Sequence, residues 1–272
     1  MAWFLYAARL LLLSSERLAF NRLGRGVPPL PAALVAYFGA AVALFAADVA
    51  AGGPIVDPSA IPGVLIYSVS FTLYFWALSV GPLSVVGAWP AATALMLWLW
   101  HPEGGFQAFA GVVLVVMGGL VLGGRLRLRA AVGIFIMLGS DASLAVGRLV
   151  DAHLAVGPPI AYAFTLFAGV SLLMGAVVAV SRGLGYAVRL ARARPGWLLA
   201  AALVNGAAYL TLIGLLQHWP PYLVEALSGA AGLVTVALGV LVLGEGDGVR
   251  KGLGAVLLSL GSALLVLTEV GR

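Results

Sequence analysis

Long apolar runs alternate with short polar, Pro-rich or Gly-rich breaks along almost the whole chain. A helix needs about 20 mostly apolar residues to cross a bilayer, so charges, prolines and glycines mark the ends of the predicted spans. Two runs are too long for one helix, and we expect breaks at Gly81-Pro82 and Trp219-Pro220-Pro221. The pattern predicts ten membrane-spanning helices, at about 2–23, 30–49, 60–80, 83–101, 105–124, 130–150, 158–180, 197–217, 221–243 and 250–268.

The composition supports the same prediction. Of 272 residues, 62% are hydrophobic and 9% are charged, whereas soluble domains have about 45–50% apolar and about 25% charged residues. We therefore expect an all-α integral membrane protein. It has no cysteine, and its three histidines are scattered, so no metal site or cofactor is predicted. The net charge of +5 fits basic loops at a membrane surface rather than nucleic-acid binding.

Two pairs of segments resemble each other across the chain. SSERLAFNRL from Ser14 resembles SDASLAVGRL from Ser140, 126 residues later, and a pair of prolines follows each copy. AGVVLVVMGG from Ala110 resembles LGAVLLSLGS from Leu253, which aligns two pairs of glycines, Gly111 with Gly254 and Gly118 with Gly261. Apolar helices also resemble one another by chance, but two matches in the same order favour a duplication.

Five helices in each half predict that the second half crosses the membrane in the opposite direction to the first. Twelve of the fifteen basic residues would then lie on one side: Arg17, Arg22, Arg25, Arg125, Arg127, Arg129, Arg182, Arg189, Arg192, Arg194, Arg250 and Lys251. The opposite connections carry the acidic residues Asp48, Asp57, Glu103 and Asp151, with only Arg148. We predict two inverted five-helix repeats, 1–126 and 127–272, in one membrane domain. Because basic loops usually face the cytoplasm, the charges put both termini outside.

Two long segments resemble a known family. YFWALSVGPLSVVGAWPAATALMLWLWHPE (74–103) and YLVEALSGAAGLVTVALGVLVLGEGDGVRKGLGAVLLSLGSALLVL (222–267) are similar to the fourth and fifth helices of the two halves of EamA-type proteins in the drug/metabolite transporter superfamily. The specific features are Pro90 thirteen residues before Glu103, Gly244-Glu245 at the end of the ninth span, and the spacing from Ser15 to Pro28. The resemblance covers nearly the whole chain.

The chain departs from the family at two motifs. It has Leu12-Leu13 where the family has Trp-Gly, and Pro102 where the family has Gly before Glu. The resemblance also implies cytoplasmic termini, which is opposite to the prediction from charge. A nine-span chain whose first segment does not cross fully would reconcile part of this conflict.

Polar side chains within the predicted spans are candidates for a substrate pathway, because an ionisable group in the bilayer is costly unless it faces a cavity or a partner. On a helix, Ser15 and Arg22 share one face, and so do Asp141 and Arg148. The repeat leaves open by one residue whether Ser15 or Glu16 corresponds to Asp141. We expect Glu16 and Asp141 either to bind a polar or zwitterionic substrate or to take up protons. The alternative is that Glu16 and Arg17 begin a cytoplasmic loop and snorkel, and that Arg148 also snorkels.

Aromatic, amide and proline residues in the spans complete this set, because Tyr and Trp offer an apolar face with one polar group and a mid-span proline frees a carbonyl. The predicted pathway residues are Ser15, Glu16, Tyr74, Trp76, Trp89, Pro90, Asp141, Arg148, Asn205, Tyr209 and Glu225. The two pairs of aligned glycines are expected to allow close helix packing. Glu103 and Glu245 are expected to cap helix ends at the membrane surface.

Inverted repeats are typical of secondary transporters, whose sites lie between the repeats. We therefore expect a transporter or exchanger of small metabolites, such as amino acids or drug-like solutes, working by alternating access in the inner membrane of a prokaryote. A lipid-carrier flippase is the alternative within transport. A membrane-embedded enzyme is disfavoured because no G-x-S-x-G or H-E-x-x-H motif is present. The oligomeric state is open between monomer and homodimer.

Overall fold

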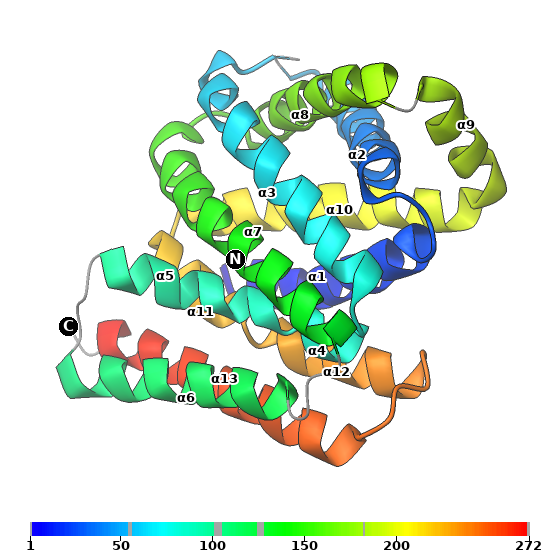
Figure 1. Cartoon of the computed structure of the whole chain (residues 1–272). Coiled ribbons are helices and arrows are strands. Elements are labelled where there is room, and N and C mark those ends of the chain that lie inside the picture. Colours follow the sequence, from blue (N-terminus) through cyan, green and yellow to red (C-terminus); the bar gives the residue numbers. More distant parts are fainter. Residues whose placement is uncertain (1, 54–55, 101–104, 124–127, 182, 271–272) are drawn as a thin grey trace.

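The computed structural model describes residues 2–53, 56–100, 105–123, 128–181 and 183–270, and every regular element in these ranges is a helix (Figure 1). The α-helices are α1 (Ala2–Gly24), α2 (Pro29–Ala51), α3 (Ile61–Val80), α4 (Leu83–Val86), α5 (Ala92–Trp100), α6 (Gly105–Gly123), α7 (Leu128–Leu154), α8 (Pro159–Ser181), α9 (Leu184–Ala193), α10 (Pro195–Leu216), α11 (Pro221–Ser228), α12 (Ala231–Leu241) and α13 (Gly248–Val270). Two short 3-10 helices are η1 (Pro58–Ala60) and η2 (Trp89–Ala91).

Eight helical segments in the described ranges are long and apolar enough to cross a membrane: Pro29–Ala51, Pro58–Val80, Gly105–Leu122, Ala130–Leu154, Pro159–Ser181, Pro195–Leu216, Pro221–Leu241 and Gly248–Leu265. The chain is thus an all-helical multi-pass membrane protein. The two remaining predicted spans are the first and the fourth. The 23 residues of α1 extend about 34 Å, enough to cross, but four of them are charged. The fourth is divided into α4, η2 and α5.

Prolines start four of the long helical segments at the breaks that the sequence predicts. Pro29, Pro159, Pro195 and Pro221 are the first residues of α2, α8, α10 and α11. Proline is favourable there because the first N–H groups of a helix have no intrahelical acceptor and its fixed φ suits the helix. At the other end of α2, Gly52 adopts φ +66° and ends the helix.

The helices pack in pairs that join distant parts of the chain. Helix α1 lies against α10, α3 against α7, α2 against α8, and α6 against α13 (Figure 1). In the last pair, a Cβ on Gly111 would lie 2.8 Å from the carbonyl oxygen of Gly261, and one on Gly118 would lie 2.7 Å from that of Gly254. The predicted role of these glycines in close packing is therefore confirmed.

Two segments are interrupted, and they pack against each other. Pro90 lies in η2 between α4 and α5, and a turn at Gly229 and Ala230 separates α11 from α12. Helices α5 and α11 are in contact, and η2 touches both α11 and α12. Irregular backbone at membrane depth is tolerated where protein buries it, and here the two interruptions bury each other.

The connections differ from the sequence prediction in two ways. The segment 182–194, expected to be a loop, contains the helix α9, because apolar residues at helical spacing bury Ala187 and Leu190. Asp48 and the pair Arg148 and Asp151, also expected in connections, are buried in α2 and α7. Helix α7 continues to Leu154 because partners on other helices compensate these charges. Glu103, Arg125, Arg127 and Arg182 lie outside the described residues.

Candidate functional site

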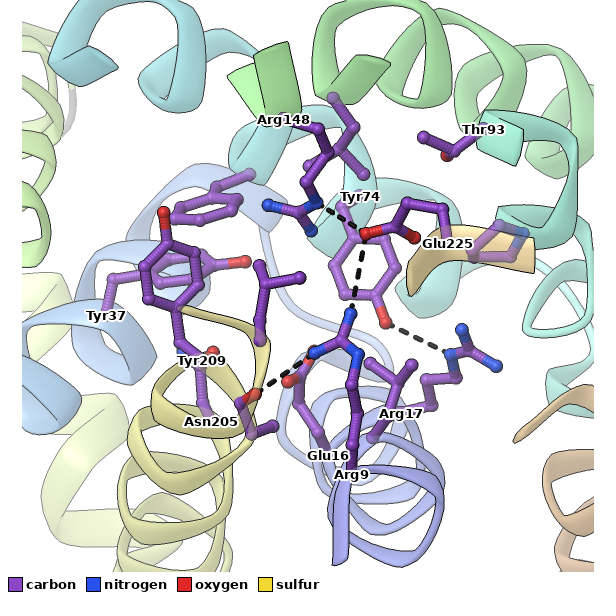
Figure 2. A pocket seen from close by; sticks show the side chains of 16 residues that line it. Arg9, Glu16, Arg17, Tyr37, Tyr74, Thr93, Arg148, Asn205, Tyr209 and Glu225 are labelled. Carbon is purple, nitrogen blue, oxygen red and sulfur yellow. Dashed lines mark hydrogen bonds and ion pairs between the residues drawn. The ribbon is translucent and has the colours of Figure 1, made fainter. Parts of the chain in front are cut away.

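A small cavity lies at the centre of the helical body, between α1, α2, α3, η2, α5, α7, α10 and α11. Its volume is about 50 Å³. Both halves of the chain contribute to its lining, which is Arg9, Leu13, Glu16, Arg17, Tyr37, Phe71, Tyr74, Pro90, Thr93, Leu144, Arg148, Asn205, Ala208, Tyr209, Leu212 and Glu225 (Figure 2). Five charged side chains in the interior of a membrane protein make this the candidate functional site.

Helix α1 supplies three of the charges. Arg9, Leu13 and Glu16 are three or four residues apart, so they share one helix face, and this face lines the cavity. Arg17 is turned by about 100° from Glu16, and its Nε and Nη1 donate to the Tyr74 hydroxyl and to Thr235 Oγ1, both at 3.3 Å. The buried polar face of α1 therefore reaches both α3 and α12.

Polar groups of α1 also stabilise the break between α11 and α12. Arg9 Nε donates to Ser228 Oγ at 2.6 Å, and Ser14 Oγ donates to the carbonyl of Ala231 at 3.0 Å. Ser228 ends α11 and Ala231 begins α12. The interrupted helix thus finds hydrogen-bond partners on α1, as buried polar groups require.

Glu225 joins the two halves across the cavity. Its Oε1 lies 2.5 Å from Arg148 Nε and 3.5 Å from Arg9 Nη2, and all three side chains are buried (Figure 2). One carboxylate is therefore shared by two guanidinium groups. Removal of one partner from such a buried group leaves uncompensated charge, which typically costs about 3–5 kcal/mol.

Asp151 forms a second buried polar cluster beside the cavity. Its carboxylate accepts hydrogen bonds from the hydroxyls of Tyr67, Tyr162 and Tyr209, the last two at 2.9 and 2.8 Å. Arg148 Nη1 lies 3.6 Å from Asp151 Oδ2 and donates to the Tyr67 hydroxyl at 2.8 Å. This cluster connects α3, α7, α8 and α10.

Glu245 occupies a different position, at the end of α3 that is remote from Tyr67. Its carboxylate accepts from the backbone N–H groups of Leu83 and Ser84 at 2.7 and 2.9 Å, and Lys251 Nζ lies 3.5 Å away. A carboxylate at the N-terminus of a helix is favourable because it satisfies free N–H groups. The predicted capping role of Glu245 is confirmed, and the helix that it caps is α4.

The structure brings seven of the eleven predicted pathway residues to the cavity: Glu16, Tyr74, Pro90, Arg148, Asn205, Tyr209 and Glu225. The other four lie elsewhere. Ser15 is exposed on the opposite face of α1, and its neighbour Ser14 is buried instead. Trp76 is 40% exposed on the outside of α3, and Trp89 packs towards Gly119 of α6. Asp141 is fully buried behind the cavity and accepts from Thr93 Oγ1 at 3.2 Å.

Sequence reasoning missed several members of the site. Arg9 is absent from the predicted pathway residues, although it lies seven residues before Glu16 and hence on the same helix face. Arg17 was considered a loop residue, and Thr93 and Asp151 were not recognised. The spacing of Arg148 and Asp151, three residues apart, is the signal that predicts their ion pair.

Some polar groups in the cavity lining have no ion-pair or hydrogen-bond partner among the described residues. Within the described part of the chain, no basic nitrogen lies within 4.0 Å of the Glu16 carboxylate, and no carboxylate lies that close to Arg17. The buried Nδ2 of Asn205 has no hydrogen-bond partner among these residues. Arg17 is hydrogen-bonded to Tyr74 and Thr235, and Glu16 to Tyr74, so these two side chains lack an ion-pair partner, whereas Asn205 has a free donor. No group of three metal-ligating side chains occurs among the described residues.

Comparisons with known proteins identify a shared fold. No family model matches the chain, and no curated protein sequence matches it. A solved structure, described only as a crystal structure of a protein, is similar with a TM-score of 0.71 over 98% of this chain and 98% of its own, at 20% sequence identity. The arrangement of helices therefore recurs in another protein of nearly the same length.

Proposed function

We propose that this protein is a secondary transporter or exchanger of small metabolites, such as amino acids or drug-like solutes, that works by alternating access around the central cavity. The observation that carries the proposal is a buried cavity with charged side chains from both halves of a multi-pass membrane protein. Glu16 and Arg17 have no ion pair among the described residues, and Asn205 has a free donor, which suits a solute that carries both positive and negative charge. The resemblance to EamA-type proteins points to the same function.

Inverted repeats of five spans each are part of the proposal, with α1 and the α4–α5 segment as the first and fourth spans. The packing supports them. Gly111 and Gly254 are equivalent in the repeat, as are Gly118 and Gly261. In the structure Gly111 contacts Gly261, and Gly118 contacts Gly254, so exchanging the two halves turns one contact into the other. A two-fold relation between the halves produces this reciprocal pattern. The contacts of α1 with α10 and of α3 with α7 are a second reciprocal pair.

The size of the cavity fits an occluded state. A volume of about 50 Å³ is far below the roughly 300–1,000 Å³ of a pocket for a drug-sized ligand. Polar contacts close the body on both sides, with the Asp151 cluster near the start of α3 and Glu245 beyond its end. Transport of a metabolite then requires these two sets of contacts to break in turn, so that the cavity opens on only one side at a time.

Counterflow in proteoliposomes tests this function. Vesicles preloaded with one amino acid should take up the labelled form in a saturable manner, and a panel of neutral, cationic and anionic solutes would define the substrate class. Asn205→Ala should raise the half-saturating concentration because it removes a free donor in the cavity. The matched control is Trp76→Phe on the outer surface, which should transport as the wild type does. Steady flux without saturation would indicate a pore instead, and movement of labelled lipids without solute exchange would indicate a flippase.

A further inference from the structure

Five arginines gather at one end of the helical body, which we call the basic face: Arg22, Arg25, Arg189, Arg192 and Arg194. They lie at the end of α1, on α9 and at the start of α10, which meet at the right-hand edge of Figure 1. Arg194 joins these segments, because its guanidinium donates to the carbonyls of Arg22, Leu23 and Arg25 at 2.8–3.1 Å.

Acidic side chains do not neutralise this face. Within the described ranges, none of the five arginines has a carboxylate oxygen within 4.0 Å. Arg22 lies over the ring of Trp197, at 5.9 Å from its centroid, and its buried Nε has no hydrogen-bond partner among the described residues. By contrast, Arg250 at the start of α13 is paired with Asp247 at 3.2 Å. The basic face therefore has positive charge available for an anion from outside the protein.

Helix α9 has the composition of a helix that lies in a membrane interface. Ala187 and Leu190 are buried against the body, Leu184 and Val188 are exposed and apolar, and its two arginines are exposed. In an interfacial helix the apolar side chains enter the acyl boundary, and the arginines remain at the level of the lipid headgroups. The positive charge of α9 thus lies where phospholipid phosphates are found.

A groove adjoins this helix at the start of α10. Its volume is about 430 Å³, and it is lined by Ala193, Arg194, Pro195, Gly196, Trp197 and Ala200. Further along α10, Leu199 and Leu203 are exposed, one helical turn apart. The charged groove therefore continues into an apolar strip along the membrane-spanning helix, which suits a molecule with an anionic head and an acyl chain and not a soluble anion.

We propose that the basic face binds an acidic phospholipid, with the headgroup phosphate in the groove at Arg194 and Trp197, within reach of the arginines of α9, and an acyl chain along α10. The binding does not depend on the proposed transport function. Each arginine near an anionic membrane surface contributes about fivefold in affinity.

Native mass spectrometry of the full-length protein in mild detergent tests this site. Titration with phosphatidylglycerol and phosphatidylcholine should show one phosphatidylglycerol retained in preference to phosphatidylcholine. The double variant Arg189→Gln/Arg192→Gln should bind phosphatidylglycerol roughly 25-fold more weakly, since two arginines are lost. Arg22→Gln should weaken it about fivefold. Arg194 is left intact because it holds the carbonyls at the end of α1.

Arg250→Gln is the matched control, because it removes one partly exposed arginine from the α12–α13 side of the molecule, where Asp247 already neutralises it. The control should retain the lipid as the wild type does, and all variants should elute as single folded species. Equal retention of the two lipids, or an unchanged double variant, would overturn the proposal. Displacement of the lipid by millimolar inorganic phosphate would also overturn it, since the site would then select a soluble anion.

Discussion

The buried carboxylate of Glu225 forms ion pairs with both Arg9 and Arg148. We predict that Glu225→Gln destabilises the protein by about 3–5 kcal/mol, since it leaves two buried guanidinium groups without a carboxylate. Unfolding of the purified protein, measured by tryptophan fluorescence in denaturant, would give the change in free energy.

The matched control for this variant is Asp247→Asn, which removes the carboxylate of an ion pair with Arg250 at the surface. Exposed pairs contribute at most about 1 kcal/mol, so this variant should unfold almost as the wild type does. If the two variants lose the same stability, burial does not determine the importance of the Glu225 pairs.

Glu16 and Asp141 differ in their access to the cavity, and under the proposed transport function this predicts which of them would couple protons to it. Glu16 lines the cavity, whereas Asp141 lies behind Thr93. In proteoliposomes, Glu16→Gln should abolish the dependence of uptake on an imposed pH gradient, because only Glu16 can exchange protons with the cavity. Asp141→Asn should keep that dependence. The reverse result, with pH dependence lost only in Asp141→Asn, would contradict the assignment.

Residues that interact within one helix could be predicted from the sequence, and those that meet across helices could not. The i, i+7 spacing places Glu16 and Arg9 on one face of α1, although sequence reasoning used this rule for Ser15 instead. The three tyrosines on Asp151 come from α3, α8 and α10, and no local pattern relates them. The separation in sequence of Glu225 from Arg9 or Arg148 likewise does not predict their ion pairs, because these pairs depend on how the helices pack.

At the scale of elements, the contact of α6 with α13 depends on glycines at the crossing. We predict that Gly118→Ala destabilises the protein by about 1–3 kcal/mol, because the new Cβ would overlap the Gly254 carbonyl at 2.7 Å and the helices must separate. Denaturant unfolding measures the change. Gly252→Ala in α13 is the control, since no atom lies within 4 Å of its Cβ position. It should raise stability by about 0.4–1 kcal/mol, and equal losses in both variants would show that close packing is not the cause.

Most helix boundaries could be predicted, because charges and prolines are local signals. The prolines at the starts of α2, α8, α10 and α11 mark real helix ends. The break between α11 and α12 has only Gly229 and its neighbours as a signal, and glycine is common throughout this chain. That break is stabilised by Arg9 and Ser14 on a distant helix. Helix α9 was missed because its arginines resemble a loop, although its apolar residues follow the helical period.

At the scale of the whole molecule, the Asp151 cluster and Glu245 lie at opposite ends of α3. Tyr67 is near its start and Leu83 follows its end, and the fourteen helical residues from Tyr67 to Val80 extend about 21 Å. Each set of contacts joins helices from both halves, so in the proposed transporter each would hold the cavity closed on one side of the membrane. The proposed alternating access would then amount to the loss of one set while the other persists.

This arrangement predicts opposite effects for two variants. Asp151→Asn weakens the cluster at one end of α3, and Glu245→Gln weakens the contacts at the other, so the cavity should open to opposite sides of the membrane. Because the chain has no cysteine, Ala208→Cys places a single reactive group in the cavity lining. A membrane-impermeant thiol reagent, added either outside or inside oriented vesicles, should label this cysteine faster from one side in Asp151→Asn and from the other side in Glu245→Gln. Ala193→Cys, exposed on α9, is the control, and its labelling should be independent of both variants. Faster labelling from the same side in both variants would show that these contacts do not close opposite ends of one pathway.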